Sequence, residues 1–165
     1  MAEAKRIQMC LVVPEQPLFI HGDSNALCRL FLILVENAVK YTPENGRVTA
    51  ALRADREGAA AEIQDTGIGI AAEDIPHIFQ RFYRADKARS RNIAGAGLGL
   101  SMAEWIAESH DAAIEVESAI GRGSAFLVRF RALASSDTLE AGSSLETSAN
   151  APDTSLPQRI FRTIR

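Results

Sequence analysis

The sequence predicts an α/β two-layer sandwich, in which helices pack on one face of a mixed β-sheet. Three observations support this fold class. Short β-favouring segments form pairs around glycine turns, two longer segments have helical periodicity, and strands and helices are mixed along the chain. The chain has 165 residues, of which 47% are apolar and 24% charged, as in an ordinary globular domain.

The first elements are two short strands and a helix. β-Favouring residues predict strands at 5–13 and 17–20, separated by a proline turn. Asp23 or Ser24 then has the character of an N-cap, and the helix that follows ends near residues 42–43. Its apolar side chains recur at helical spacing and would face the core: Leu27, Leu30, Phe31, Leu34, Val35 and Ala38.

A hairpin follows, opened by Gly46, with strands at 47–54 and 59–65. Residues 73–79 predict a short helix with a proline in its first turns. Residues 80–97 are polar, rich in arginine and end in glycines, so we expect a long mobile loop.

The second amphipathic helix is expected at 98–109, with Met102, Trp105 and Ile106 facing inward. Segments 114–117 and 124–131 then form a final hairpin. These elements place the domain at residues 1–133. From 134 the composition changes to small polar and acidic residues, so we expect 134–165 to be a disordered tail, with a short docking helix at 156–165 as the alternative.

Composition limits the classes of partner. The net charge of −3, without an arginine and lysine block, argues against nucleic acid. Cys10 and Cys28 lack metal-binding spacing and fit a reduced, cytoplasmic setting. No apolar run reaches the roughly 18 residues of a membrane span, and the N-terminus lacks a signal-peptide core. We therefore expect no membrane contact by this segment, although a longer parent protein could be membrane-anchored.

Three segments carry the chemistry, in a fixed order: Asn37–Thr42, Asp65–Gly69 and Gly95–Leu100. The first places Asn37, Lys40 and Tyr41 on one helical face, where an amide oxygen suits magnesium, a cation suits phosphate and a ring suits a purine. A solvated helix end is the plain alternative. Together the three segments predict nucleotide binding, and the nucleotide is expected to be ATP.

The second and third segments complete that prediction. Asp65, at a strand end, can accept a hydrogen bond from the adenine amine, and the glycines Gly67 and Gly69 let the backbone turn under the base. A common Asp-Thr-Gly turn is the alternative. The glycine run lacks a Walker A ending and follows a loop, so it fits a hinge opening a helix N-terminus that holds phosphate. A glycine-rich linker without a ligand is the alternative there.

Over residues 5–131 the chain resembles the catalytic and ATP-binding domain of sensor histidine kinases, within the superfamily of gyrase, the Hsp90 chaperones and MutL. Five segments carry the resemblance: residues 34–43 are similar to the N box, 65–69 to the G1 box, 78–84 to the F box, 95–100 to the G2 box and 121–124 to the closing glycine turn. The F box is the most discriminating, because it belongs to histidine kinases and not to gyrase or the chaperones.

The resemblance implies a Bergerat-type fold and transfer of the γ-phosphoryl group of ATP to a histidine nitrogen. Asn37 would ligate Mg²⁺, Asp65 would bind the adenine amine, residues 80–97 would form the ATP lid, and Arg81 or Arg84 would approach the γ-phosphate. The implied catalytic residues are Asn37, Lys40, Arg81 and Arg84. The implied nucleotide-binding residues are Asn37, Lys40, Tyr41, Asp65, Gly67, Gly69, Ile70, Phe82, Gly95, Gly97, Leu98, Gly99, Leu100 and Ser124.

Two departures from the family pattern stand out. Ile33 occupies the position of an asparagine one turn before Asn37, and in the hydrolytic relatives that position is a glutamate that activates water. An apolar side chain cannot bind metal or activate water, so we expect reduced magnesium affinity and inefficient ATP hydrolysis. A His-Gly-Gly turn of the family is replaced by His110-Asp111-Ala112, which should alter only a turn.

None of the three histidines, His21, His77 and His110, lies in the context of a phosphoacceptor. The implied partners are therefore a phosphoacceptor histidine domain, in the same parent protein or in trans, and a downstream response regulator. Two alternatives stay open: a stand-alone serine kinase of the superfamily, which the F box disfavours, and a degenerate nucleotide-binding module that serves as a regulated surface, which Ile33 favours.

Overall fold

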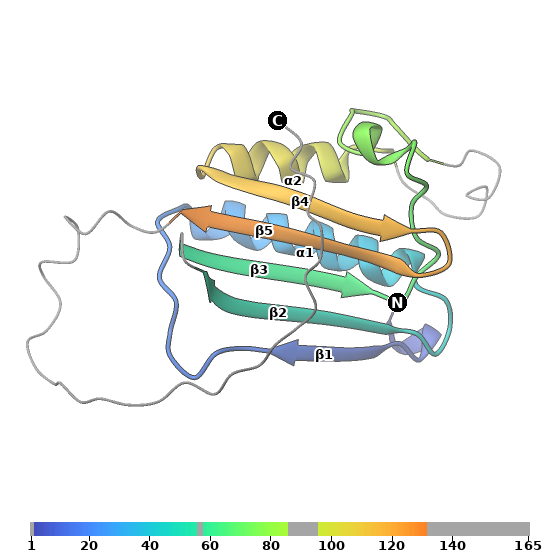
Figure 1. The fold of residues 1–165 in the computed structure, drawn as a ribbon, viewed down its shortest axis with the longest axis horizontal. Coiled ribbons are helices and arrows are strands. Elements are labelled where there is room, and N and C mark those ends of the chain that lie inside the picture. The colour runs from blue at the N-terminus through green and yellow to red at the C-terminus, as the bar shows by residue number, and fades with distance from the viewer. Residues whose placement is uncertain (1, 56–57, 86–95, 132–165) are drawn as a thin grey trace, which may run out of the picture.

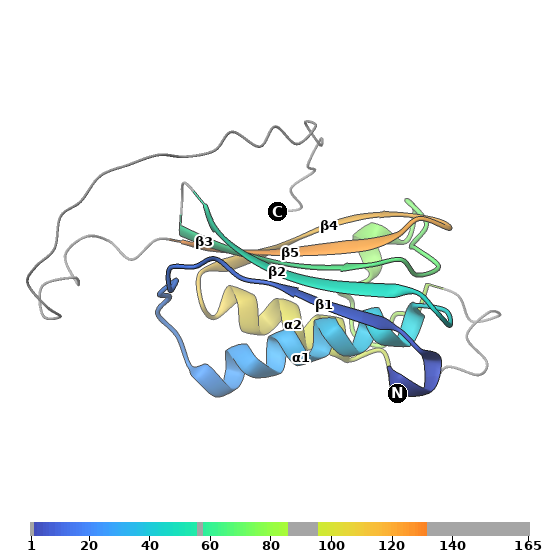
Figure 2. The ribbon, with the colours of Figure 1, turned by 90° about the horizontal axis from the view of Figure 1, so that it is seen from below.

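A computed structural model describes residues 2–55, 58–85 and 96–131 of the chain. Its elements run, in order, through the 3₁₀ helix η1 (Glu3–Lys5), β1 (Gln8–Val12), α1 (Ser24–Tyr41), β2 (Arg47–Asp55), β3 (Gly58–Asp65), the 3₁₀ helix η2 (Ile75–His77), α2 (Gly99–Glu108), β4 (Ala112–Ala119) and β5 (Gly123–Arg131). The strands form one sheet, and α1 and α2 lie on the same face of it (Figures 1 and 2). The predicted two-layer sandwich is confirmed.

The sheet is mixed, as predicted, with strand order β1-β2-β3-β5-β4. β1 pairs with β2 in parallel, whereas β2, β3, β5 and β4 pair antiparallel. Along β3, Ile63 and Asp65 lie on the face toward the helices, because Ile63 belongs to the core and side chains alternate along a strand. The register places Val48 of β2 opposite Asp65.

The helix α1 follows its sequence signals closely. Asp23 caps it, with a side-chain oxygen that accepts a hydrogen bond from Ala26 N at 2.8 Å. Leu30 and Leu34 are fully buried, and they join Val128 of β5 in one core cluster between the two layers. Burying each such leucine stabilises the fold by about 1.5–3 kcal/mol. The packed core therefore fixes which face of α1 remains available for ligands.

Two expected elements were wrong or too long. Residues 17–20 form no strand; Leu18 and Ile20 pack on the core and Phe19 is exposed. The expected helix at 73–79 is reduced to the single 3₁₀ turn η2, where hydrogen bonds reach three residues back: His77 N donates to Asp74 O at 2.8 Å and Gln80 N donates to His77 O at 2.9 Å. The predicted strand at 114–117 is longer, and runs over the full length of β4.

The inward face of α2 was also predicted wrongly in part. Met102 and Trp105 are exposed, with 43% and 64% of their surface accessible, whereas Ile106 is buried as expected. The face toward the core is made by Ala103, Ile106 and Ala107. Apolar residues occur all around this helix, so periodicity alone could not choose between its faces.

Three expectations concern segments outside the described residues: most of the lid loop 80–97, the tail 134–165 and its docking helix. Neither helix in the described part of the chain combines the length and apolar character that a membrane crossing requires.

Candidate functional site

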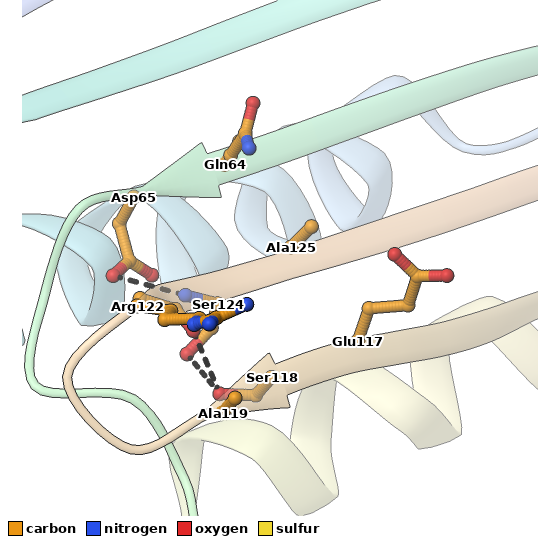
Figure 3. A pocket seen from close by; sticks show the side chains of 9 residues that line it. Gln64, Asp65, Glu117, Ser118, Ala119, Arg122, Ser124 and Ala125 are labelled. Atoms are coloured by element: carbon orange, nitrogen blue, oxygen red, sulfur yellow. Dashed lines mark hydrogen bonds between the residues drawn. The ribbon is translucent and has the colours of Figure 1, made fainter. Parts of the chain in front are cut away.

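Asp65 is the buried centre of the site. It ends β3 and is only 5% exposed. Its Oδ1 atom accepts hydrogen bonds from Gly67 N at 2.7 Å and Ser124 N at 3.3 Å, and Figure 3 shows the carboxylate turned toward Ser124. Within the described residues Oδ2 accepts no hydrogen bond, and it is not sealed from solvent. One carboxylate oxygen is therefore held by the protein while the other remains open to an outside donor.

The environment of Asp65 acts on its protonation in two opposed ways. Burial raises the pKa of the carboxyl, because the charged form loses hydration. The backbone N–H groups of Gly67 and Ser124 lower the pKa, but by less than burial raises it. A ligand donor bonded to Oδ2 would favour the charged form further.

The glycine segment after Asp65 is packed too tightly for any other residue. A Cβ on Gly67 would lie 2.5 Å from Asp65 Oδ1 and 2.7 Å from the carbonyl oxygen of Tyr41. Gly69 has φ +72°, and a Cβ there would lie 1.9 Å from Ala119 O. Gly67 therefore lies directly against the end of α1, and Gly69 lies directly against the turn between β4 and β5.

The last turns of α1 meet this segment. Ile68 N donates to Tyr41 O at 3.2 Å, which ties the helix end to the residues after Asp65. Asn37, Lys40 and Tyr41 are all half-buried. Lys40 Nζ lies 5.0 Å from the centre of the Tyr41 ring, a cation–π contact. The structure thus brings together the first and second of the three predicted segments.

The third segment is joined to the site through α2 and the F-box-like residues. Gly97 has φ +70°, and a Cβ on it would lie 2.9 Å from the backbone of Phe82, whose N–H donates to Gly97 O at 2.8 Å. α2 begins at Gly99 after Leu98, which supplies no side-chain cap, so first-turn N–H groups remain for an anion. Leu100 packs partly on the core.

Ile33 closes the space between the helices. It is 5% exposed, and a Cβ built on Gly99 would lie 3.3 Å from Ile33 Cγ2. The position one turn before Asn37 therefore faces the glycine run that opens α2. A polar residue here would lie next to that run, but isoleucine offers it no ligand atom.

The segment 81–84 carries the two predicted arginines. Arg81 is exposed and Arg84 is half-buried. Phe82 between them has φ +66° and is 71% exposed, a strained conformation for an aromatic residue. Tyr83 donates its hydroxyl hydrogen to Asp74 Oδ1 at 2.6 Å, and this bond raises the pKa of Tyr83. The roles of Arg81 and Arg84 toward phosphate stay predictions.

Ser118 is a site residue that sequence reasoning missed. Its Oγ donates to Gly123 O at 2.9 Å, accepts from Ile70 N at 2.8 Å and lies 2.9 Å from Ser124 Oγ. It thereby fixes both Ile70 and Ser124, two of the predicted nucleotide-binding residues. The signal was its position opposite Ser124 in the last hairpin, which becomes visible only once the register is known.

An open hollow of about 310 Å³ adjoins Asp65 on its other side (Figure 3). Its lining includes Gln64, Glu117 and Ala125, which share one row of the sheet register and alternate with core residues. This row faces away from the helices, whereas the hollow is also lined by the site residues Asp65, Ser118 and Ser124. Asn37 and Lys40 do not line it.

Most predicted site residues thus converge around Asp65, the end of α1 and the start of α2. Gly95 lies outside the described residues, so its placement is not part of this picture. No three His, Cys, Asp or Glu side chains gather into a metal-binding group in the described ranges. A magnesium ion would therefore rely on Asn37 with oxygens from phosphate and water.

Comparison with known proteins points to one family. Residues 22–134 match the family described as histidine kinase-, DNA gyrase B-, and HSP90-like ATPase. The chain is 40% identical over 129 residues to the sensor histidine kinase RppB of a Synechocystis species, covering 78% of this chain and 28% of that protein. It is 40% identical over 111 residues to the phosphate regulon sensor protein PhoR of Pseudomonas aeruginosa, covering 67% and 25%.

Solved structures of histidine kinases also resemble this chain. The mycobacterial sensor histidine kinase MprB superposes with a TM-score of 0.65 at 29% identity, covering 77% of this chain and 83% of that one. Full-length ShkA, solved in complex with AMPPNP, superposes with a TM-score of 0.67 at 30% identity, covering 77% and 26%. The chain spans about a quarter of the length of the two curated relatives.

Proposed function

The chain belongs to the family of histidine kinase-, DNA gyrase B- and HSP90-like ATPases, and from that premise we propose the following activity. It binds ATP with Mg²⁺ and transfers the γ-phosphoryl group to a histidine on a separate dimerisation and phosphoacceptor domain. The family supports ATP binding, and the names of the similar proteins support the kinase assignment.

The observation that carries the proposal is the asymmetric use of the Asp65 carboxylate. One oxygen accepts two backbone N–H groups, while the other accepts nothing from the described residues and can receive the exocyclic amine of adenine. Guanine carries a carbonyl at that place and would meet the carboxylate with an acceptor. The site is therefore built to select adenine.

The remaining residues would position the triphosphate. Asn37 supplies one amide oxygen to Mg²⁺, Lys40 offsets phosphate charge, and the N–H groups at the start of α2 bind phosphate oxygens. Phosphoryl transfer needs mainly such positioning and charge neutralisation, so a nearby general base is not required. Arg81 or Arg84 would approach the γ-phosphate from the segment before the lid.

The partners belong to the proposal as well. The phosphoacceptor domain would supply the histidine, in the same parent protein or in trans, and a response regulator would receive the phosphoryl group next. ShkA, whose structure contains AMPPNP, supports a nucleotide triphosphate in the equivalent fold. We place the segment in the cytoplasm, where ATP is available, and residues 1–133 form the catalytic domain in this proposal.

One observation keeps a second candidate function in view. Ile33 is buried against the glycine run where the family carries a polar residue. An apolar side chain there removes one ligand from magnesium, which favours a degenerate module that binds nucleotide weakly and serves as a regulated surface.

A transfer assay separates the two. The chain is mixed with a dimeric histidine hairpin from a related kinase, radiolabelled ATP and Mg²⁺, and the acid-labile phosphoryl label on the hairpin is measured. Label that disappears when the acceptor histidine is changed to glutamine supports the kinase. ATP binding without label, tested over several hairpins, would contradict the kinase and favour the regulated surface.

A further inference from the structure

We propose that Lys5 is a positioning residue for the nucleotide site, an inference that rests on the proposed function. Lys5 lies at the end of η1, before the family match at residues 22–134 and outside the three predicted binding segments. Its side chain nevertheless reaches the end of α1, where Asn37, Lys40 and Tyr41 are located. Figure 2 shows this N-terminal segment beside that helix end.

The Lys5 ammonium makes three hydrogen bonds at the end of α1. Its Nζ donates to the carbonyl oxygens of Val39 at 3.1 Å, Lys40 at 2.8 Å and Thr42 at 2.9 Å. An ammonium has three N–H donors, so each has one acceptor. The positive charge also lies at the negative end of the helix dipole, which is the favourable end for a cation.

The other carbonyls of the turn have their own partners. Ala38 O accepts from Thr42 N at 3.0 Å and Thr42 Oγ1 at 2.6 Å, and Tyr41 O accepts from Ile68 N at 3.2 Å. The last carbonyls of an α-helix have no partner within the helix. Lys5 satisfies three of these five consecutive carbonyls, more than any other side chain in the described part of the chain.

Lys5 is itself held in place by its backbone. Its carbonyl accepts from Asn45 N at 2.9 Å, and Gln8 N donates to Gly46 O at 2.9 Å. Ile7, two residues further on, is buried in the core. The ammonium is therefore carried by a fixed segment, and its position relative to α1 is set by the fold.

The consequence concerns the groups that would contact ATP. Lys40 and Tyr41 start from the backbone that Lys5 holds, and Tyr41 O is bonded to Ile68 in the segment after Asp65. Without the ammonium, three part-buried carbonyls lose their donor and the turn opens toward water. The Lys40 cation and the Tyr41 ring would then spend less time in the binding arrangement.

The test compares Lys5→Met, which keeps the apolar stem, with the parent chain in calorimetric titration by Mg·ATP. We expect the affinity for Mg·ATP to fall about three- to tenfold, the loss that corresponds to about one net hydrogen bond. Arg53→Met is the matched control, because it removes a cation from a surface ion pair with Glu62 at 3.1 Å. Its affinity should equal that of the parent within a factor of about two.

Three further readouts separate positioning from a general loss of stability. Lys5→Arg keeps the cation and should recover most of the affinity, and amide exchange at Ile68 should quicken in Lys5→Met only. In a Lys40→Met background, the added effect of Lys5→Met should shrink, because one of the two groups that Lys5 positions is gone. If Lys5→Met folds poorly, Lys5→Gln, which removes the charge but keeps an amide donor, is titrated in its place and should also lose affinity.

Equal affinity of the parent and Lys5→Met, or an undiminished effect in the Lys40→Met background, would overturn the role of Lys5 alone. A parent chain that binds no Mg·ATP would overturn the proposed function instead. The two failures are therefore distinguishable in one set of titrations.

Discussion

Replacing Asp65 with asparagine tests the centre of the site with almost no change in shape. The asparagine oxygen can still accept the N–H groups of Gly67 and Ser124. What changes is the open atom, which turns from a charged acceptor into an NH₂ donor. The new NH₂ group and the adenine amine would then both be donors, so no hydrogen bond could form between them.

The magnitude follows from the bond that is lost. A hydrogen bond to a charged group contributes about 1.5–3 kcal/mol, which corresponds to roughly one to two orders of magnitude in dissociation constant. Calorimetric titration with Mg·ATP at pH 7.5 measures this directly. An Asp65→Asn chain that binds within about threefold of the parent would refute the role assigned to the open oxygen.

The same substitution has an opposite expected effect on stability. The pKa of Asp65 is raised above its ordinary value of 3.8 chiefly by burial, so the folded state binds the proton more tightly than the unfolded state. The contribution of this group to stability is therefore complete below pH 3.8 and is lost as the pH rises through the folded-state pKa. At pH 7.5, Asp65→Asn should be at least as stable as the parent, with a difference that closes toward pH 3.8.

Thermal unfolding at pH 7.5 and at pH 4 to 5 checks this sign. A variant that binds ATP poorly and unfolds at the same or higher temperature shows that Asp65 serves the ligand at a cost to the fold. A clear drop in melting temperature at pH 7.5 would mean that the charged backbone bonds outweigh burial.

Two further predictions concern glycine packing and Ile33. Gly123→Ala should lower the free energy of unfolding by about 2–4 kcal/mol, because φ is +83° and the new Cβ would lie 2.0 Å from Asp65 O. Gly121→Ala, with φ +74° but open space around it, is the control and should lose only about 1 kcal/mol in urea unfolding. Ile33→Asn should lower stability by about 1–3 kcal/mol yet tighten Mg·ATP binding, and unchanged affinity in titration would contradict the proposal that the triphosphate binds beside Ile33.

The predictable parts of the fold are those with local signals. α1 combines a capping Asp23 with a clear apolar stripe, and both signals act within a few residues. The hairpin strands likewise follow from β-favouring segments on either side of glycine turns. The two exposed side chains Met102 and Trp105 were predicted to face inward, because the choice of face depends on how α2 meets α1 and not on its own sequence.

In the site too, residues with local sequence signals were predicted and residues that act through long-range contacts were not. Asp65, its glycines and the end of α1 were predicted from residue types, and the structure brings them together. Ser118 was missed because its place opposite Ser124 depends on the strand register and its bond to Ile70 N spans 48 residues. Lys5 was missed because it acts on residues far along the chain. Lys5 is separated by 35 residues from Lys40, whose carbonyl it binds. No sequence pattern within one element could indicate such a contact.

The hydrogen bond from Phe82 N to Gly97 O has a consequence for how this protein can vary. It holds the backbones of Phe82 and Gly97 side by side, although 15 positions separate them in the sequence. The entropy of closing a loop grows only with the logarithm of its length, about 0.6 kcal/mol for each doubling. The closure entropy would therefore change little with the number of residues that join Phe82 to Gly97. Gly97 itself cannot be replaced without displacing the Phe82 backbone, which a new Cβ would approach to 2.9 Å.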